Sequence, residues 1–258
     1  LRTNQQLVLR WAEHERVHLL VAQGKRLPWI VVRAVGKDKD PTAPGRHVHR
    51  PILCGLEGNI ARFKEGDRVL VTSAAGPVGA TAGQLAKAWG AKEVVGIAGS
   101  DEKCAWLKDE AGFDAVINYK TCGDLDGAIS GAMPKGVDIL FDNVGNAMIN
   151  RVLPLMRMHG RICVSGQVAD YNLTPEETPG IINTKPFITH RVNMQGLVVF
   201  DFAKGFQEAL GTMAAMIGDG RINLKEERFE GIEKMPEAFC GLFTGENFGR
   251  RVVKVGDE

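Results

Sequence analysis

The stretch from residue 67 to residue 90 constrains the fold of this chain more than any other part of its sequence. It reads DRVLVTSAAGPVGATAGQLAKAWG and predicts a strand, a tight turn and a helix in immediate succession. Residues 67–74 are rich in Val and Leu, as in a strand that is buried on both faces of a sheet. Residues 78–89 carry apolar side chains at helical spacing. This succession favours an α/β fold with a parallel sheet.

The turn itself, Gly76-Pro77-Val78-Gly79, opens the predicted helix. A helix N-terminus carries unpaired backbone N–H groups and the positive end of the helix dipole, so it binds a pyrophosphate readily. Because they lack a Cβ, Gly76 lets a phosphate approach the backbone and Gly79 lets the helix pack close to the strand. The usual fingerprint has three glycines, whereas this chain has Ser73 at the first position. The turn therefore indicates a dinucleotide site, and a strand–turn–helix corner that binds nothing stays open as the alternative.

The end of the next predicted strand, 93–100, indicates which dinucleotide is bound. Chains that bind NAD normally place Asp or Glu there to bind the ribose hydroxyls, but this strand ends in Gly99 and Ser100. Lys103 follows in the next predicted helix, and Tyr119 ends the strand after that. Small residues and a cation suit a 2′-phosphate, so we expect NADP(H) as the cofactor. The spacing is equally compatible with Lys103 as an ordinary solvated lysine of its helix.

From residue 67 onward, predicted strands and helices alternate. The predicted strands cover 67–74, 93–100, 115–119, 137–144, 160–166 and 192–200, and the predicted helices cover 78–89, 101–111, 146–157 and 203–218. Such alternation implies a parallel sheet with right-handed crossovers, which is a doubly wound, Rossmann-type α/β fold. The polar stretch 169–186 is predicted as a loop beyond the carboxyl end of a strand, where such sheets bind ligands.

Several motifs, in the same order along the chain, resemble one family. They are SAAGPVGATAGQLAKAWGAKEVVGIAGSDEKCAWLKDEAGFDAVINYK (73–120), FDNVGNAMIN (141–150), GRICVSGQVADYN (160–172), RVNMQGLVVFDF (191–202) and GENFGRRVVKV (245–255). Together they resemble the zinc-free medium-chain dehydrogenases/reductases, in the branch of prostaglandin reductases and NADP-dependent alkenal double-bond reductases. The resemblance covers roughly residues 64–258.

This resemblance implies cofactor roles for five residues of the chain. The family's lysine and tyrosine that match Lys103 and Tyr119 hold the 2′-phosphate. Its asparagines that match Asn143 and Asn247 line the cofactor, and the segment that matches Phe200 lies near the nicotinamide.

The resemblance also implies an activity, namely NADPH-dependent reduction of the C=C bond of α,β-unsaturated aldehydes or ketones by hydride transfer to the β-carbon, without a metal. Charge then develops on the carbonyl oxygen, and a hydrogen-bond donor near that oxygen lowers the barrier. We expect Tyr171, in the predicted loop, to be this donor and to relay the proton. A loop tyrosine that only packs its ring is the alternative for Tyr171. A non-catalytic NADP(H)-binding protein is the alternative for the chain.

Residues 1–63 depart from the family, in which a long, β-rich substrate domain precedes the cofactor domain. Only TNQQLVLR (3–10) is similar to the opening strand of that domain. Residues 11–27 have helical spacing, and the Gly/Pro/Lys/Asp-rich run 36–51 is typical of a loop or linker. Either this is a shortened relative, or the first part of the sequence is not what the family's chain would be.

We therefore expect three parts in the chain: a reduced substrate-domain (GroES-like) remnant at 1–63, an NADP(H)-binding domain at 64–220 and a C-terminal segment at 221–258 that returns to the substrate domain. The C-terminal segment has strand, helix and strand character. Its strands, 224–230 and 250–255, would present unpaired edges, so we expect a homodimer that covers them. An open pocket admits water and positions an alkene poorly, so we also expect slow turnover.

The only competing chemistry lies near the start of the chain, where His14-Glu15-Arg16-Val17-His18 matches the pattern HExxH. On a helix, His14 and His18 would share one face and could bind Zn²⁺, with Glu15 as general base of a hydrolase. No third ligand follows at the extended spacing of such sites. We favour a polar helix face with two surface histidines, and we expect no metal site.

Composition narrows the partners and the compartment. The net charge of +1 argues against nucleic acid or an anionic membrane as the main partner. The sequence has no apolar run near the length of a membrane span and no signal-peptide h-region at residue 1. Its five cysteines are scattered singly, which is not a disulfide framework. We expect a cytoplasmic protein whose partner is a small-molecule enal or enone.

Overall fold

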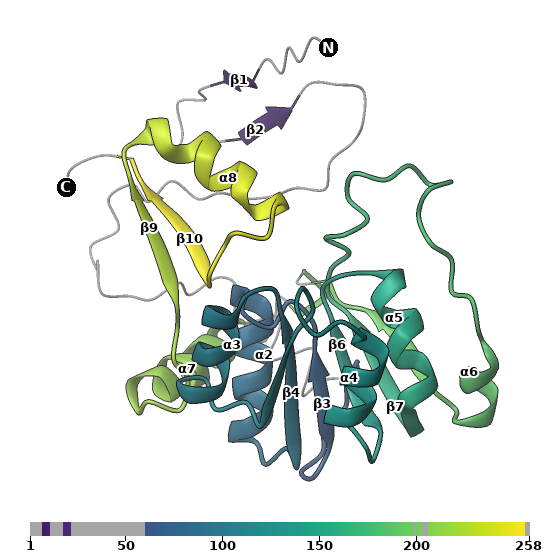
Figure 1. The fold of residues 1–258 in the computed structure, drawn as a ribbon. Helices are drawn as coiled ribbons and strands as arrows, with labels where there is room; N and C mark the ends of the chain where they lie inside the picture. The colour runs from purple at the N-terminus through teal and green to yellow at the C-terminus, as the bar shows by residue number, and fades with distance from the viewer. Residues whose placement is uncertain (1–6, 11–17, 22–59, 199, 203–205, 256–258) are drawn as a thin grey trace. The chain divides into compact units, whose positions relative to one another are not determined.

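The computed structural model describes residues 7–10, 18–21, 60–198, 200–202 and 206–255 (Figure 1). The chain divides into two units. The larger unit spans Ala43–Lys225, and the other comprises Leu1–Thr42 with Glu226–Glu258.

The larger unit is built on a six-stranded parallel sheet with the order β5-β4-β3-β6-β7-β8. Its strands are β3 (Arg68–Val71), β4 (Glu93–Ala98), β5 (Ala115–Asn118), β6 (Val137–Asp142), β7 (Met156–Val164) and β8 (Asn193–Gly196). The chain starts in the middle at β3, adds β4 and β5 on one side, and returns to add β6, β7 and β8 on the other. This order is that of the doubly wound Rossmann fold, so the expected fold class is confirmed.

Helices connect these strands and lie on both faces of the sheet (Figure 1). They are α2 (Pro77–Ala88), α3 (Asp101–Asp109), α4 (Leu125–Ala132), α5 (Asn146–Val152), the 3-10 turn η1 (Leu153–Leu155), α6 (Lys185–Thr189) and α7 (Phe206–Gly218). After α7, Asn223 is fixed to α2, because its backbone N–H donates to Gln84 Oε1 at 2.6 Å and its carbonyl accepts from Gln84 Nε2 at 2.9 Å.

The central strands are buried on both faces, as their Val- and Leu-rich sequences predict. On one face, Leu70, Val95 and Leu140 belong to a buried cluster with Ile129 of α4 and Ile149 of α5. Successive side chains of a strand point to opposite faces of the sheet. Because helices cover both faces of a parallel sheet, the side chains on both must be apolar.

On the other face, the glycines of α2 and β4 admit a single aromatic ring. A Cβ on Gly83 would collide with the ring of Phe113, and a Cβ on Gly96 would lie 3.0 Å from it. The helix layer therefore packs closely on this face, and the ring of Phe113 fills the space between α2 and β4.

Several boundaries differ from those that the sequence predicts. The helix expected at 146–157 ends at Val152, because Pro154 cannot continue an α-helix. β7 consequently starts at Met156, four residues before its expected start at 160. The strand expected at 192–200 is only Asn193–Gly196.

Helix α4 was not predicted, because its sequence, LDGAISGA, is rich in glycine and buries only Ile129. Its start is fixed by Asp124, whose carboxylate accepts from the Gly127 N–H at 3.1 Å. The predicted loop is confirmed from residue 169 to residue 184, after which α6 begins.

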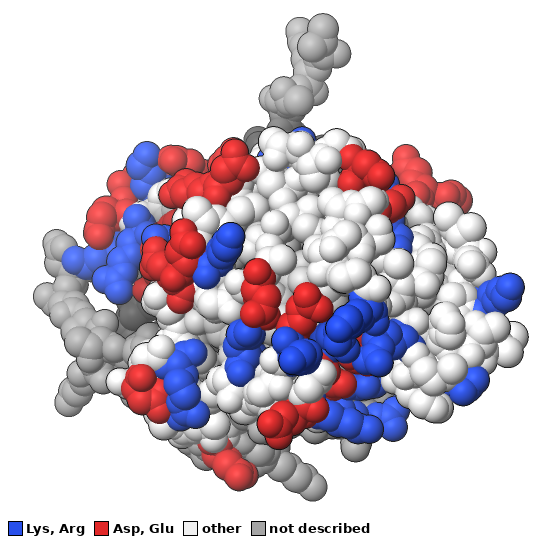
Figure 2. Space-filling view, turned by 60° about the horizontal axis from the view of Figure 1, so that its bottom comes forward, with Lys and Arg blue, Asp and Glu red and all other residues white. Residues whose placement is uncertain are grey.

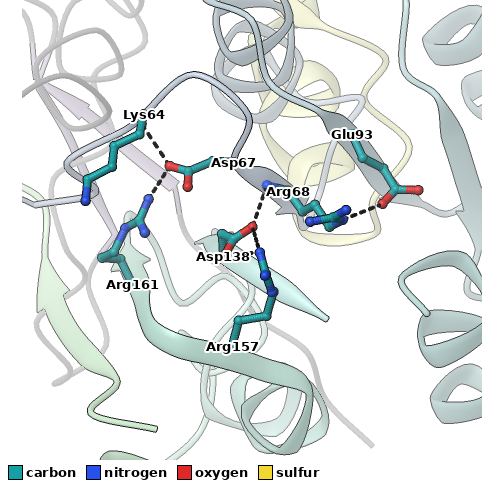
Figure 3. Close-up of polar contacts among 7 residues, drawn as sticks. All are labelled: Lys64, Asp67, Arg68, Glu93, Asp138, Arg157 and Arg161. Atoms are coloured by element: carbon teal, nitrogen blue, oxygen red, sulfur yellow. Dashed lines mark hydrogen bonds and ion pairs between the residues drawn. The ribbon is translucent and has the colours of Figure 1, made fainter. Parts of the chain in front are cut away.

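A group of ion pairs joins the amino-terminal ends of the strands (Figure 3). Asp138, at the start of β6, accepts from the Arg68 N–H at 2.9 Å and from Arg157 Nη1 at 2.8 Å. Arg68 in turn lies 3.6 Å from Glu93 at the start of β4. These contacts hold the four neighbouring strands β4, β3, β6 and β7 together at the edge of the sheet opposite to the glycine turn.

The second unit contains a strand–helix–strand segment, as expected for 221–255. Its elements are β9 (Glu226–Glu230), the 3-10 turn η3 (Ile232–Lys234), α8 (Met235–Phe243) and β10 (Arg250–Lys254). β9 and β10 pair with one another in parallel, so within the described residues each of these strands keeps one unpaired edge. The side chain of Arg251 fixes this arrangement, since it bonds Glu227 at 2.7 Å and the Ala238 carbonyl at 3.2 Å.

Near the start of the chain, β1 (Leu7–Arg10) pairs in antiparallel fashion with β2 (His18–Val21). β1 confirms the strand expected in 3–10. The helix expected at 11–27 is wrong for residues 18–21, which form β2. The rest of that stretch, like most of 1–63, lies outside the described residues.

The surface carries both signs of charge. In Figure 2, which shows one face of the molecule, Lys and Arg atoms alternate with Asp and Glu atoms among the described residues. Of the helices in the described ranges, none combines the length and the apolar character that crossing a membrane demands.

Candidate functional site

At the position of the missing first glycine, the turn has a backbone conformation that normally favours glycine. Ser73, which occupies that position, has a φ of 49°, in the left-handed region where glycine is favoured. Gly76 has a φ of −75°, so its backbone does not require glycine. The chain thus makes the tight turn with a serine at the strained position.

Gly79 is needed for close packing of the turn. A Cβ at this residue would lie 2.5 Å from the Ser73 carbonyl oxygen and 2.8 Å from Ala74 Cα. Because both neighbours are backbone atoms, the helix could not stay in place with any larger residue. The predicted reason for Gly79, close approach of helix and strand, is confirmed.

The N-terminus of α2 fits a bound pyrophosphate. Pro77 occupies the first turn, where no intrahelical N–H bond is lost. Gly76 provides no side-chain cap, and the first turn of α2 holds no acidic residue that would oppose an anion. The backbone N–H groups of Val78 and Gly79 belong to the orphan donors of a helix start, which are the groups that a phosphate could accept hydrogen bonds from.

The residues expected to read the ribose phosphate lie together at the carboxyl ends of β4 and β5. A Cβ on Gly99 would lie 2.9 Å from the Tyr119 ring and 3.1 Å from its hydroxyl, so the ring covers the Gly99 backbone. The hydroxyl of Ser100 caps α3 by accepting from the Lys103 N–H at 3.3 Å. Lys103 therefore stands in the first turn of α3, four residues after Gly99.

A second cation at this edge was not found from the sequence. The ammonium nitrogen of Lys120 lies 6.0 Å from the centroid of the Tyr119 ring. Its place in the sequence could have identified it, since Lys120 directly follows Tyr119, which the sequence already marks as a cofactor residue. Lys120 is thus a cation that the structure places beside the exposed ring of Tyr119.

Asn143 lies at the opposite side of β3, where β6 ends. Its backbone N–H donates to Thr72 Oγ1 at 2.8 Å, and its side-chain Nδ2 donates to the Thr72 carbonyl oxygen at 2.8 Å. Thr72 follows β3 directly, so Asn143 is fixed between the carboxyl ends of two adjacent strands. In doubly wound sheets, ligands bind in the crevice at this reversal of strand order.

Beneath Asn143 lies a buried carboxyl group, Asp142, which the sequence analysis did not single out. It accepts from Thr72 Oγ1 at 2.7 Å and from the Gly145 N–H at 2.8 Å. Burial raises the pKa of Asp142 to about 6, against the lowering effect of these hydrogen bonds, and the nearby charge of Asp170 raises it further. Burial, with a smaller contribution from Asp142, raises the pKa of the Cys163 thiol to about 12, so this cysteine is inert.

The loop after β7 carries Tyr171 to the same edge. A Cβ on Gly166 would lie 3.7 Å from the Tyr171 hydroxyl and 3.2 Å from the Asn143 carbonyl oxygen. The hydroxyl of Tyr171 is therefore close to the backbone that carries Asn143. This brings the expected hydrogen-bond donor and one expected cofactor ligand to the same end of the crevice.

Two asparagines of α5 hold this loop. Asn146 Nδ2 donates to the Pro179 carbonyl at 2.6 Å, and Asn150 Nδ2 donates to the Gly180 carbonyl at 2.9 Å. These residues are one helical turn apart, so they project from the same side of α5. The loop is thus fixed to α5, while at its start the N–H groups of Ser165 and Gly166 donate to the carbonyl of Asp142, the last residue of β6, at 2.8 and 3.2 Å.

Phe200 and Asn247 are the two remaining predicted cofactor residues. Phe200 follows β8 and is 80% exposed. Asn247 belongs to the other unit, where its Nδ2 lies 3.5 Å from the Gly249 carbonyl. Of the two histidines of the HExxH pattern, His18 is in β2 and His14 lies outside the described residues. Within the described ranges, no three His, Cys, Asp or Glu side chains are grouped to hold a metal ion.

Comparison with known proteins connects this arrangement to a family. A family model described as "Zinc-binding dehydrogenase" matches residues 77–215. The (+)-pulegone reductase of Mentha piperita is 43% identical over 76% of this chain and 56% of its own length. Prostaglandin reductase 1 of Bos taurus is 42% identical over 78% of this chain and 59% of its own length. The chain thus spans less than two thirds of the length of these curated relatives.

A solved structure agrees with both the sequence match and the fold. The crystal structure of CurA from Vibrio vulnificus in complex with NADPH superposes with a TM-score of 0.78 at 33% identity, over 85% of this chain and 67% of that one. The resemblance drawn from the motifs is confirmed, and the chain belongs to the zinc-binding dehydrogenase family of medium-chain dehydrogenases and reductases.

Proposed function

We propose that this chain is an NADPH-dependent reductase of the C=C bond of α,β-unsaturated aldehydes or ketones. The observation that carries the proposal is the row of groups along the carboxyl edge of one sheet. The helix start at Gly76–Gly79 suits a pyrophosphate. Lys103 and Tyr119, which follow the neighbouring strands β4 and β5, suit a 2′-phosphate, and Asn143 in the crevice suits the nicotinamide half. The names of relatives at 42% to 43% identity, a pulegone reductase and a prostaglandin reductase, support the reaction class.

The cofactor is NADP(H), and the residues that bind it are those expected from the sequence. When bound, the nicotinamide supplies a hydride to the β-carbon of the substrate. Tyr171 donates a hydrogen bond to the carbonyl oxygen, where negative charge develops, and its phenol can pass on a proton. Phe200 and Asn247 remain part of this proposal, as residues beside the nicotinamide and along the cofactor.

The remaining expectations belong to the same proposal. The three-part division at residues 63 and 220 follows the family's order of domains. A cytoplasmic location and a reaction without zinc are expected because the motifs resemble the zinc-free branch of the family. A homodimer is supported by open strand edges among the described residues, since β8 ends its sheet with all four residues exposed and β9 and β10 form a pair.

Turnover can be tested directly with a short 2-alkenal as substrate. We expect alkenal-dependent oxidation of NADPH, and we expect Tyr171→Phe to lower kcat about a hundredfold with unchanged NADPH affinity. Tight NADPH binding without turnover would instead indicate a non-catalytic NADP(H)-binding protein. Stoichiometric zinc that is lost in the His14→Ala/His18→Ala double variant would indicate the hydrolase.

A further inference from the structure

The point where the sheet reverses its order contains a closed set of hydrogen bonds. β3 lies between β4, which follows it in the chain, and β6, which is added after the return. Thr72 directly follows β3, and Asp142 is the last residue of β6. The Thr72 N–H also donates to the Phe141 carbonyl at 3.1 Å, so the two strand ends are joined through backbone and side chain alike.

Each polar group of Thr72 is used in this set. Its hydroxyl donates to Asp142 Oδ1 at 2.7 Å and accepts from the Asn143 N–H at 2.8 Å. Its carbonyl oxygen accepts from Asn143 Nδ2 at 2.8 Å. Asp142 is held on its other side by the Gly145 N–H at 2.8 Å. Thr72 and Asp142 are both fully buried, so these bonds form without competition from water.

These bonds decide which way the Asn143 amide faces. Since Nδ2 is committed to the Thr72 carbonyl, Oδ1 occupies the other arm of the planar amide. An amide held in this way offers an acceptor to a ligand in the crevice. The nicotinamide half of NADPH carries two kinds of donor that could meet it, the ribose hydroxyls and the carboxamide NH₂ group.

We propose that Thr72 and Asp142 are positioning residues, which orient Asn143 so that its carbonyl oxygen accepts a hydrogen bond from the nicotinamide half of NADPH. This inference rests on the proposed function, because it requires that the chain bind NADPH. It adds two buried residues that contact the cofactor only through Asn143.

The test compares NADPH with 2′,5′-ADP, which lacks the nicotinamide half. Thr72→Val keeps the shape of the side chain and removes its hydroxyl. We expect it to weaken NADPH binding about tenfold and to leave 2′,5′-ADP binding unchanged. Thr72→Ser keeps the hydroxyl and should restore NADPH affinity. Both affinities are measured by fluorescence titration of the folded chain.

A second variant covers the case in which Thr72→Val does not fold. Asn143→Ala keeps the backbone N–H to Thr72 and removes only the amide, so the buried bonds of Asp142 remain. It should weaken NADPH and spare 2′,5′-ADP in the same way. Where both variants fold, the double variant should lose no more than either alone, because both remove one contact.

The reduced 3-acetylpyridine analogue of NADPH, which lacks the carboxamide NH₂, separates the two donors. If a ribose hydroxyl is the donor, Thr72→Val weakens the analogue as much as NADPH. If the carboxamide is the donor, the analogue binds wild type and variant equally.

Three results are decisive against the inference. Unchanged NADPH affinity in Thr72→Val and Asn143→Ala would overturn the positioning role, and so would equal losses of NADPH and 2′,5′-ADP in the folded variants. A wild-type chain that binds no NADPH would overturn the proposed function itself, and the positioning role with it.

Discussion

Arg161, in β7, forms an ion pair with Asp67, which precedes it by 94 residues and lies just before β3. Figure 3 shows this contact. Both residues are buried, with relative exposures of 9% and 8%. Arg161 Nε also donates to the Ala61 carbonyl at 2.8 Å, and the Lys64 N–H donates to Asp67 at 2.8 Å. The pair thus fastens the segment that leads into the sheet to a strand two positions away.

Removing one partner of this pair should be costly. We expect Arg161→Met to lower the free energy of unfolding by about 3–5 kcal/mol, because it leaves the Asp67 carboxylate buried without its cation. Replacing both residues, as Arg161→Met with Asp67→Leu, should recover much of that loss. Arg151→Met, which breaks an exposed pair with Asp126, serves as control and should cost at most about 1 kcal/mol. Urea unfolding measures all four proteins, and equal losses for Arg161→Met and Arg151→Met would contradict the expectation.

Gly79→Ala tests the close packing of the glycine turn. An added Cβ would meet backbone atoms of Ser73 and Ala74, so α2 must shift, at a cost of about 1–3 kcal/mol. The shift should also weaken NADPH, because the donors at the helix start move with it. Gly131→Ala is the matched control, since that helical glycine has open space around its Cβ position. It should stabilise the chain by up to about 1 kcal/mol, and thermal unfolding distinguishes the two.

Lys103→Ala tests the preference for NADPH over NADH. A charge-assisted contact with the 2′-phosphate should be lost, so NADPH should bind roughly ten- to a hundredfold more weakly. NADH lacks this phosphate and should be almost unaffected. Lys108→Ala, in the last turn of the same helix, should change neither affinity. Equal losses for NADPH and NADH in a cofactor fluorescence titration would mean that Lys103 does not bind the phosphate.

The sheet could be predicted from the sequence because its strands are buried on both faces and its helices alternate with them. Errors arose where a local signal was weak or misleading. Pro154 ends α5 early, and glycines in α4 hide a helix that begins at an aspartate cap. At His18, pairing with β1 prevails over helical spacing. In each case, backbone stereochemistry or pairing along the chain outweighs the periodicity of apolar residues.

The candidate site was only half predictable. The glycine turn and the small residues at the end of β4 are local patterns, so the sequence shows them directly. Thr72 and Asp142 are 70 residues apart, and only the order of the strands in the sheet brings them together. No local pattern marks them, although both stand at the carboxyl end of a predicted strand.

The raised pKa of Asp142 makes a definite prediction about stability and pH. Burial raises this pKa from 3.8 to about 6, and the groups that face the carboxyl are Thr72, the Val144 and Gly145 N–H groups, Cys163 and Asp170. Since the folded state binds the proton more tightly than the unfolded state, Asp142 favours folding at low pH. That contribution is lost as the pH rises through about 6.

We therefore expect the free energy of unfolding of the wild type, relative to Asp142→Asn, to rise by about 2 kcal/mol between about pH 7.5 and about pH 4.5. Groups that titrate alike in the wild type and in Asp142→Asn cancel in this difference. The change of the difference with pH therefore reports on Asp142. Asp170→Asn should flatten this slope, because the nearby charge of Asp170 helps to raise the pKa of Asp142. Urea unfolding at a series of pH values measures it. Parallel profiles for wild type and Asp142→Asn would show that this carboxyl is not desolvated in the folded chain.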